Sequence, residues 1–281
     1  MTPEQLEILE ELDACERDSA EAAEILADAV EDGDVALITA ILDRGVDPNI
    51  RNEDGETAIF HAFDSEVAAL LLARGANPNV IDESGRNALF SCQTPEVAEM
   101  LIAHGVDPNQ TDKWGKTPIF ECQDRETLQV LLEHNANPNH KDKDGANALF
   151  RDHIYEWEQD NAGCIALLLK YGADATVINK YGQNALFGSD EPEVVTLLLK
   201  HGADANAIDD EGQNALFCCT NKAVLQILIE HGANAKTTDN NGRNALFIQN
   251  DLEAMELLIQ NGADPKCIDH NGQTAPALCR N

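Results

Sequence analysis

Two stretches decide the fold: DESGRNALF at residues 82–90 and TPEVAEMLIAHGVDPN at residues 94–109. The glycine of the first stretch returns at intervals of 30, 30, 30, 37, 30, 30 and 30 residues. The glycine of the second stretch returns in phase with it, replaced once by Asn135. The first glycine stands at Gly55, Gly85, Gly115, Gly145, Gly182, Gly212, Gly242 and Gly272. The chain is therefore a tandem array of one unit, in which each copy needs its neighbours to bury its apolar face.

Each unit is predicted to contain one regular helix. The residue eleven positions before the second glycine is a good N-cap in seven of the eight copies, because its side chain can accept hydrogen bonds from free backbone N–H groups. Apolar residues such as Val67, Leu70 and Leu71 follow at helical spacing, and the glycine supplies the left-handed residue that ends the helix. The predicted N-caps are Asp34, Asp64, Thr94, Asp124, Asn161, Asn221 and Asp251, and Glu191 is the exception.

A second N-cap in each unit predicts a short inner helix. Six copies have Asn87, Thr117, Asn147, Asn184, Asn214 or Asn244 at this position. Three residues later stands a phenylalanine, which we interpret as a stacked core ladder. This column comprises Phe60, Phe90, Phe120, Phe150, Phe187, Phe217 and Phe247.

Three cysteines share the position two residues after the phenylalanine: Cys92, Cys122 and Cys219. Neighbouring helices pack about 8 to 10 Å apart, which exceeds the roughly 7 Å limit between the Cα atoms of a disulfide. We therefore expect this column to stay reduced.

At these residues the sequence resembles the ankyrin-repeat family, over residues 19–281. The resemblance implies an all-α repeat solenoid of about eight to nine units, each a helix-turn-helix followed by a β-hairpin finger. The copies here are three residues shorter than the usual unit of about 33, so the inner helix should lose nearly a turn. The family's TPLH motif reads NALF, TPIF or TAIF, so a packing phenylalanine replaces its histidine. Stacking should therefore rely more on apolar contact.

The ends of the array depart from the pattern. Residues 1–18 predict an acidic N-terminal capping helix that starts with a capping box of Thr2 and Gln5, with Pro3 between them. A separate interaction helix is the alternative. Residues 19–50 form a starting unit with two helices, and residues 269–281 form a truncated terminal unit.

The composition excludes several classes of protein. Lys plus Arg number 19 against 51 for Asp plus Glu, a net charge of −32, which argues against direct binding of nucleic acid. No apolar run approaches the roughly 18 residues of a membrane helix, and the N-terminal stretch is acidic rather than that of a secretory signal. We expect a cytoplasmic protein that binds no membrane and is a monomer when free.

Motifs of catalysis are missing from the sequence. It contains no GxxxxGK, HExxH, GxSxG or CxxC, so we expect no enzyme, no catalytic residue and no cofactor. His104, His134, His201 and His231 recur once per unit and cannot converge on one metal. The acidic stretch from Glu156 lacks the glycine and glutamate of a calcium loop, so we expect no metal site.

The 37-residue interval points to the binding surface. Its seven extra residues fall within RDHIYEWEQDNAG, residues 151–163, and insertions in repeat arrays often map to the binding face. This insertion in the fifth unit holds two of the five Trp and Tyr residues, and two more occupy finger tips on either side of it. Aromatic residues are enriched in interface hot spots. The candidate partner-binding residues are Trp114, Asp152, Tyr155, Glu156, Trp157, Glu158, Asp160 and Tyr181. The alternative for Trp157 is packing of a longer helix.

These features lead to a functional hypothesis. We expect a non-catalytic protein-binding module whose acidic concave surface sequesters or inhibits a basic protein partner. The short NALF-type repeats look like those of bacterial ankyrin proteins, some of which are immunity proteins that neutralise toxins. Two alternatives stay open: an effector or adaptor scaffold for a cellular or host protein, and an acidic nucleic-acid mimic that inhibits a DNA-binding enzyme.

Overall fold

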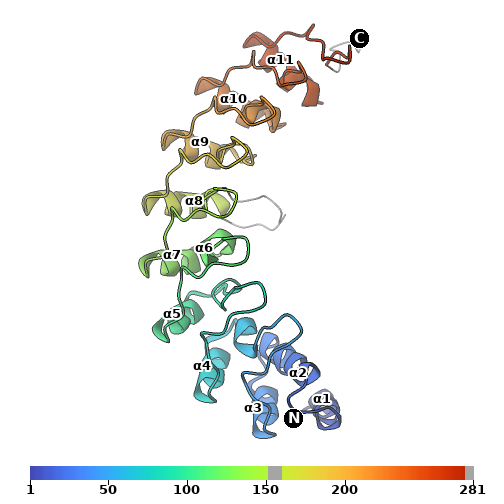
Figure 1. The fold of residues 1–281 in the computed structure, drawn as a ribbon, viewed down its shortest axis with the longest axis vertical. Helices are drawn as coiled ribbons and strands as arrows, with labels where there is room; N and C mark the ends of the chain where they lie inside the picture. Colours follow the sequence, from blue (N-terminus) through green and yellow to red (C-terminus); the bar gives the residue numbers. More distant parts are fainter. Residues whose placement is uncertain (151–159, 276–281) are drawn as a thin grey trace. The chain divides into compact units, whose positions relative to one another are not determined.

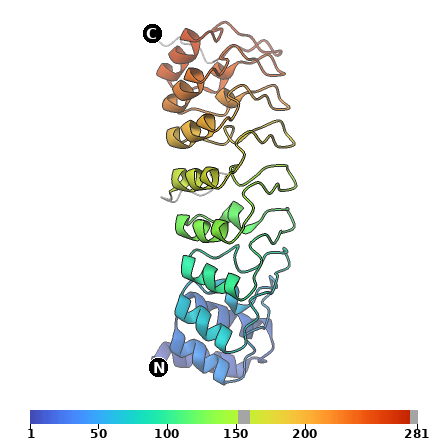
Figure 2. The same ribbon diagram turned by 90° about the vertical axis from the view of Figure 1, so that its left-hand side faces the viewer.

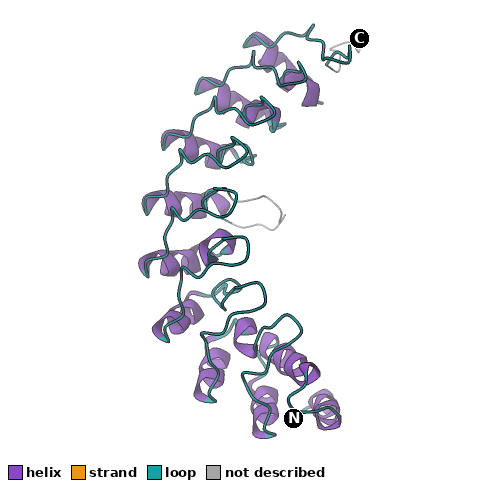
Figure 3. Cartoon of the chain, viewed as in Figure 1, coloured by secondary structure: helices purple, strands orange, loops and turns teal. Residues whose placement is uncertain are grey.

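The computed structural model describes residues 1–150 and 160–275. These residues form two compact units, Met1–Asn137 and Pro138–Asn281 (Figure 1). In each unit, helices alternate with long loops, and the loops project to one side of the helices (Figures 2 and 3). Within the described ranges the regular secondary structure is helical, and the only β-pairing is an isolated bridge between Ile268 and Thr274.

One helix per repeat carries the apolar stripe predicted from the sequence. In the first unit α1, α2 and α3 pack together, followed by α4, α5 and α7; in the second unit α8 packs on α9, α9 on α10 and α10 on α11. The long helices are α1 (Pro3–Ala14), α2 (Ala20–Glu31), α3 (Val35–Asp43), α4 (Ser65–Ala73), α5 (Pro95–Ala103), α7 (Arg125–Glu133), α8 (Asn161–Lys170), α9 (Pro192–Lys200), α10 (Lys222–Glu230) and α11 (Leu252–Gln260).

Most of the predicted N-caps are confirmed. The side chains of Asp34, Asp64, Asp124, Asn221 and Asp251 accept hydrogen bonds from backbone N–H groups of the first helical turn. Two predictions are wrong. Thr94 precedes α5 without capping it, because its hydroxyl donates instead to the carbonyl of Phe63 in the preceding repeat. Asp160, rather than Asn161, caps α8 and accepts from Gly163 N–H at 2.8 Å, so α8 starts one residue earlier than expected.

The helix ends follow the sequence pattern. Each glycine of the second set has a positive φ, and Asn135, which replaces one of them, has a φ of 67°. It is the one non-glycine residue with positive φ in the described chain, and asparagine tolerates this conformation better than other residues with a side chain.

The inner helix is shorter than predicted. Three repeats form a single 3-10 turn there, one forms a four-residue α-turn, and the others form hydrogen-bonded turns. The three missing residues leave too few backbone groups to close a second helical turn. These elements are η1 (Ala58–His61), α6 (Pro118–Glu121), η2 (Ala215–Phe217) and η3 (Ala245–Ile248).

The phenylalanine column forms part of the core, as expected. Phe60, Phe90, Phe187 and Phe217 are buried, while Phe120, Phe150 and Phe247 are half-buried. Leu or Ile precedes the phenylalanine in each turn, and these residues are buried as well, so the inner turns and the long helices share one apolar layer.

A buried asparagine fastens the short inner turn in five of the repeats. Its Oδ1 accepts the N–H two residues later, and its Nδ2 donates to the carbonyl of the loop that follows the long helix of the same repeat. In Asn184 these distances are 3.1 Å to Leu186 N and 2.8 Å to Asp204 O. The same two bonds are made by Asn87, Asn147, Asn214 and Asn244. Thr57 and Thr117 stand at the equivalent position with buried hydroxyl groups that have no hydrogen-bond partner.

A second asparagine, at the end of the GADPN stretch, connects neighbouring repeats within each unit. The Nδ2 of Asn49 donates to Gly75 O at 3.0 Å, and its Oδ1 accepts from Asn77 N at 2.6 Å. Asn206 makes the same pair of bonds to Gly232 and Asn234. Polar ties therefore accompany the apolar stacking between repeats.

The cysteine column is reduced, as expected. Cys92, Cys122 and Cys219 are buried free thiols, and each donates to the carbonyl of the residue two positions later. Burial raises the pKa of Cys92, and it raises the pKa of Cys219 to about 12. Cys92 and Cys219 are therefore protonated packing groups rather than nucleophiles.

The N-terminal helix forms with the predicted capping box. Thr2 and Gln5 cap α1 reciprocally, and Leu9 and Leu12 bury its apolar side. The amide of Gln5 also donates to Asp34, the N-cap of α3, and this hydrogen bond is the main reason why the pKa of Asp34 is lowered. Helix α1 thus packs on the first helices of the array.

The asparagine column allows a matched test of stability. We expect Asn184→Asp to lower the free energy of unfolding by about 3 kcal/mol, because it buries a carboxylate against the carbonyl of Asp204. Asn179→Asp makes the same chemical change in a finger, where six of the other seven repeats have aspartate, and should stay within about 0.5 kcal/mol. Urea unfolding followed by circular dichroism measures both. Equal losses would contradict the role given to the buried amide.

Candidate protein-binding surface

The fingers between the repeats are built by an aspartate or asparagine. In every finger its Oδ1 accepts two backbone N–H groups, two and four residues later; for Asp112 these are Trp114 and Lys116, at 2.9 and 2.8 Å. The equivalent residues are Asn52, Asp82, Asp142, Asn179, Asp209, Asp239 and Asp269. The side chain thus closes the loop. The finger follows the path of the expected β-hairpin, but within the described residues it contains no regular strands.

Neighbouring fingers of one unit are joined by their backbones. Lys113 N donates to Ser84 O at 2.7 Å in the first unit, and Asp210 N donates to Tyr181 O at 2.9 Å in the second. In six fingers the carbonyl of the residue before the finger glycine accepts such a bond; these residues are Asp54, Ser84, Asp144, Tyr181, Glu211 and Asn241. Trp114 is held within its own finger, where its N–H donates to Asp112 Oδ1. The tip side chains are presented on a fixed backbone.

Two of the predicted binding residues stand at these tips. Trp114 is 51% exposed and Tyr181 is 44% exposed, which confirms that neither fills a core position. Lys113 Nζ lies 4.4 Å from the centroid of the Trp114 ring, and Lys180 Nζ lies 4.9 Å from that of Tyr181. Each aromatic ring is thus paired with a cation of its own finger.

The insertion is covered only in part. Asp152, Tyr155, Glu156, Trp157 and Glu158 lie outside the described residues. Asp160 is described, and its carboxylate caps α8, so it has a structural role. Trp114 belongs to the first unit and Tyr181 to the second, so the structure places each within its own unit.

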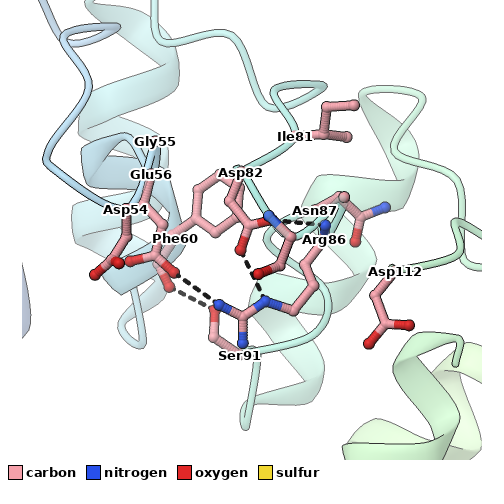
Figure 4. A network of polar contacts seen from close by, with 12 residues as sticks. Asp54, Gly55, Glu56, Phe60, Ile81, Asp82, Arg86, Asn87, Ser91 and Asp112 are labelled. Carbon is pink, nitrogen blue, oxygen red and sulfur yellow. Dashed lines mark hydrogen bonds and ion pairs between the residues drawn. The ribbon is translucent and has the colours of Figure 1, made fainter. Parts of the chain in front are cut away.

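The first unit contains a polar network that sequence reasoning missed (Figure 4). Arg86 Nε donates to Asp82 Oδ2 at 2.7 Å, and its NH2 group lies 3.5 Å from Glu56 Oε1 in the previous finger. The other oxygen of Glu56 lies 3.2 Å from His61 Nε2, an ion-pair distance without the alignment of a hydrogen bond. His61 Nδ1 in turn lies 2.7 Å from Glu31.

The network sets the charge of His61. The contact with Glu56 is the largest cause of a raised pKa of His61; burial opposes the rise, and the bond to Glu31 adds to it. The pKa of Glu56 is lowered, chiefly by His61. The contact therefore favours the charged form of both groups. The sequence contained a signal, because Glu31 and His61, like Glu56 and Arg86, are 30 residues apart. Single charges at repeat positions are common in so acidic a chain, however, and do not by themselves indicate a network.

The sequence and the fold of this chain are similar to those of known repeat proteins. The family model for ankyrin repeats, described as three copies, matches residues 26–112, 91–179, 152–239 and 187–269. The chain belongs to the ankyrin-repeat family. The crystal structure of the human ASB11 ankyrin repeat domain is similar, with a TM-score of 0.64 and 23% sequence identity over 73% of this chain and 96% of that one. No curated protein matches the sequence. Ankyrin repeats are protein-interaction modules, so the fingers and inner turns are candidate contact surfaces.

The ankyrin fingers also expose an apolar residue that sequence reasoning missed. The position directly before the finger aspartate or asparagine is isoleucine in four repeats, and these side chains are 45 to 58% exposed. They are Ile81, Ile178, Ile208 and Ile268. Their recurrence at a single position before the finger aspartate or asparagine was the available signal.

Other kinds of site find no support in the described residues. No group of three or more His, Cys, Asp or Glu side chains there could hold a metal ion, and no helix in these ranges is long and apolar enough to cross a membrane.

The pKa shifts of the network predict a pH-dependent stability. A raised pKa of His61 stabilises the fold below about pH 6.5, and this contribution is lost as the pH rises through the folded-state pKa. A lowered pKa of Glu56 stabilises above about pH 4.5 and is lost as the pH falls through its folded-state pKa. His61→Gln should therefore cost on the order of 1 kcal/mol near pH 5.5 and much less at pH 9.

Thermal melts of the parent protein and of His61→Gln between pH 5.5 and pH 9 measure this loss of stability. The control is His231→Gln, because the ring of His231 bonds to the carbonyl of Ile227 rather than to a carboxylate. A His61→Gln effect that is independent of pH would contradict the charged state assigned to the network.

Proposed function

We propose that this ankyrin-repeat protein binds a basic protein partner and thereby sequesters or inhibits it. The observation that carries the proposal is the acidity of the exposed surface. Residues 1–34 contain thirteen acids and one cation, Arg17, and twelve of these acids are exposed in the structure. A surface of one sign attracts a partner of the opposite sign over distances of about one Debye length.

The aromatic tips supply the second part of the proposal. Trp114 and Tyr181 combine exposed rings with a backbone that is fixed by the neighbouring finger, so little entropy is lost when they are buried. We propose that the insertion residues Asp152, Tyr155, Glu156, Trp157, Glu158 and Asp160 also contact the partner. The acidic field would speed the encounter, and the aromatic residues would hold the complex.

The role of the complex has three candidate forms. An immunity protein that neutralises a toxin is our first choice, because a small chain with no motif of catalysis can act by covering a basic surface. An adaptor for a cellular protein and an acidic mimic of nucleic acid are the alternatives. A pull-down from the native cell, with the captured protein identified by mass, separates them: a toxin, a host or cellular factor, or a DNA-binding enzyme.

The charge hypothesis predicts a strong dependence on salt. With the purified partner, affinity should fall by about tenfold or more when NaCl rises from about 50 to 200 mM, because exposed charges are screened. The variant Glu7→Gln, Glu10→Gln, Glu11→Gln neutralises part of the exposed acidic surface of α1 and should slow association. Calorimetry and stopped-flow mixing measure both effects. If the affinity does not change with salt concentration, the partner is not recognised through its charge.

The aromatic hypothesis predicts hot spots. Trp114→Ala and Tyr181→Ala should each weaken partner binding by about tenfold or more, and Tyr155→Ala with Trp157→Ala should abolish it, while helical content and melting temperature barely change. Leu252→Ala is the control, because Leu252 is 57% exposed at the start of α11, away from the finger tips. Unchanged affinity in the aromatic variants would remove these residues from the interface.

A further inference from the structure

The finger aspartates have a second carboxylate oxygen, and two repeats show what it binds. Oδ1 closes the loop, which leaves Oδ2 for another donor. Asp82 Oδ2 accepts from Arg86 Nε at 2.7 Å. Asp239 Oδ2 lies 2.8 Å from both Nε and NH2 of Arg243. In both fingers the arginine stands four residues after the aspartate, and the aspartate side chain is only 1% exposed.

The third finger has the aspartate without the arginine. Asp112 is 6% exposed, and its Oδ1 accepts from Trp114 and Lys116 N–H as in every finger. Its Oδ2 is buried and has no hydrogen-bond partner. Lys116 occupies the position of the missing arginine. Figure 4 shows the bond between Asp82 and Arg86 and the position of Asp112.

Among the described fingers, only that of Asp112 has a second carboxylate oxygen that is both buried and without a hydrogen-bond partner. Asn52 and Asn179 have an amide in place of the carboxylate, and Gln183 Nε2 lies 3.5 Å from Asp209 Oδ2. A buried carboxylate oxygen without a donor is unfavourable, so a ligand that supplies one is bound more tightly.

We propose that Asp112 is a docking point for an arginine side chain of the protein partner. The guanidinium group would take the place that Arg86 and Arg243 take in their own fingers, with planar donors that match a carboxylate. The half-exposed Lys116 side chain would swing aside, and the exposed ring of Trp114, two residues from Asp112, offers a face on which a guanidinium can stack. This subsite deepens the proposed binding of a basic protein and rests on it.

The competing occupant is Lys116 itself. If its ammonium group pairs with Asp112 in solution, the oxygen is already satisfied and no partner is needed. Lysine is a compact, strongly hydrated charge and is less suited to a buried carboxylate than arginine. Exchange of Lys116 for arginine therefore separates the two cases, because it would fill the subsite from within, as in the second and seventh fingers.

The test uses arginine in a short peptide and needs no identified partner. In the Trp157→Phe background Trp114 is the sole tryptophan, and its fluorescence reports binding of acetyl-Gly-Arg-Gly-Arg-Gly-amide at low ionic strength. The variant Asp112→Asn keeps the Oδ1 acceptor, as the natural asparagines of two fingers do. Asp142→Asn makes the same change of charge at the same position of the next finger and is the matched control.

We expect Asp112→Asn to raise the dissociation constant of the arginine peptide by roughly tenfold, and Asp142→Asn by less than about twofold. Lys116→Arg should weaken binding of the arginine peptide as strongly as Asp112→Asn does. A peptide with lysine in place of arginine should bind the parent protein more weakly, and Asp112→Asn should leave its affinity unchanged. Equal effects of the two asparagine variants, or no effect of Lys116→Arg, would overturn the subsite. Those results would leave the salt dependence of partner binding to decide the proposed function separately.

Discussion

The hydrogen bonds of a buried asparagine hold the inner turn in five of the repeats. The shortened inner segment can close only a single turn, so it has too few backbone hydrogen bonds to hold its own shape. The amide of residues such as Asn184 replaces them: one end accepts the N–H of the turn, and the other donates to the loop beyond the long helix. Each bond is formed away from water, where losing it costs most. The apolar ladder of phenylalanines can then pack on a fixed turn.

The fingers apply the same principle at the surface. One carboxylate or amide oxygen closes each loop, and backbone bonds connect successive fingers within a unit. Exposed rings such as Trp114 and Tyr181 are therefore carried by an ordered backbone, which suits them to recognition because little freedom remains to be lost on binding. In proteins generally, binding residues often lie on loops that helices or strands support.

Charge is organised on two scales in this molecule. The exposed acids of the first helices act at a distance and are weakened by salt. The contacts around Arg86 and His61 are close and partly buried. They pair Arg86 with Asp82 and Glu56 and raise the pKa of His61. Asp112 differs from Asp82 and Asp239. Its Oδ2 is buried like theirs, but no arginine binds it.

The sequence alone determined the features that depend on local residue type and on the period of 30. These are the repeat, the long helices with most of their caps, the left-handed glycines and the exposed finger tips. Tertiary structure decided the rest. Contacts with the neighbouring repeat decide whether Thr94 caps a helix and whether the inner segment is a helix or one turn. They also decide which charged side chains meet. Glu31, Glu56 and Arg86 come together only when three repeats stack, since residues about 30 positions apart become neighbours through packing.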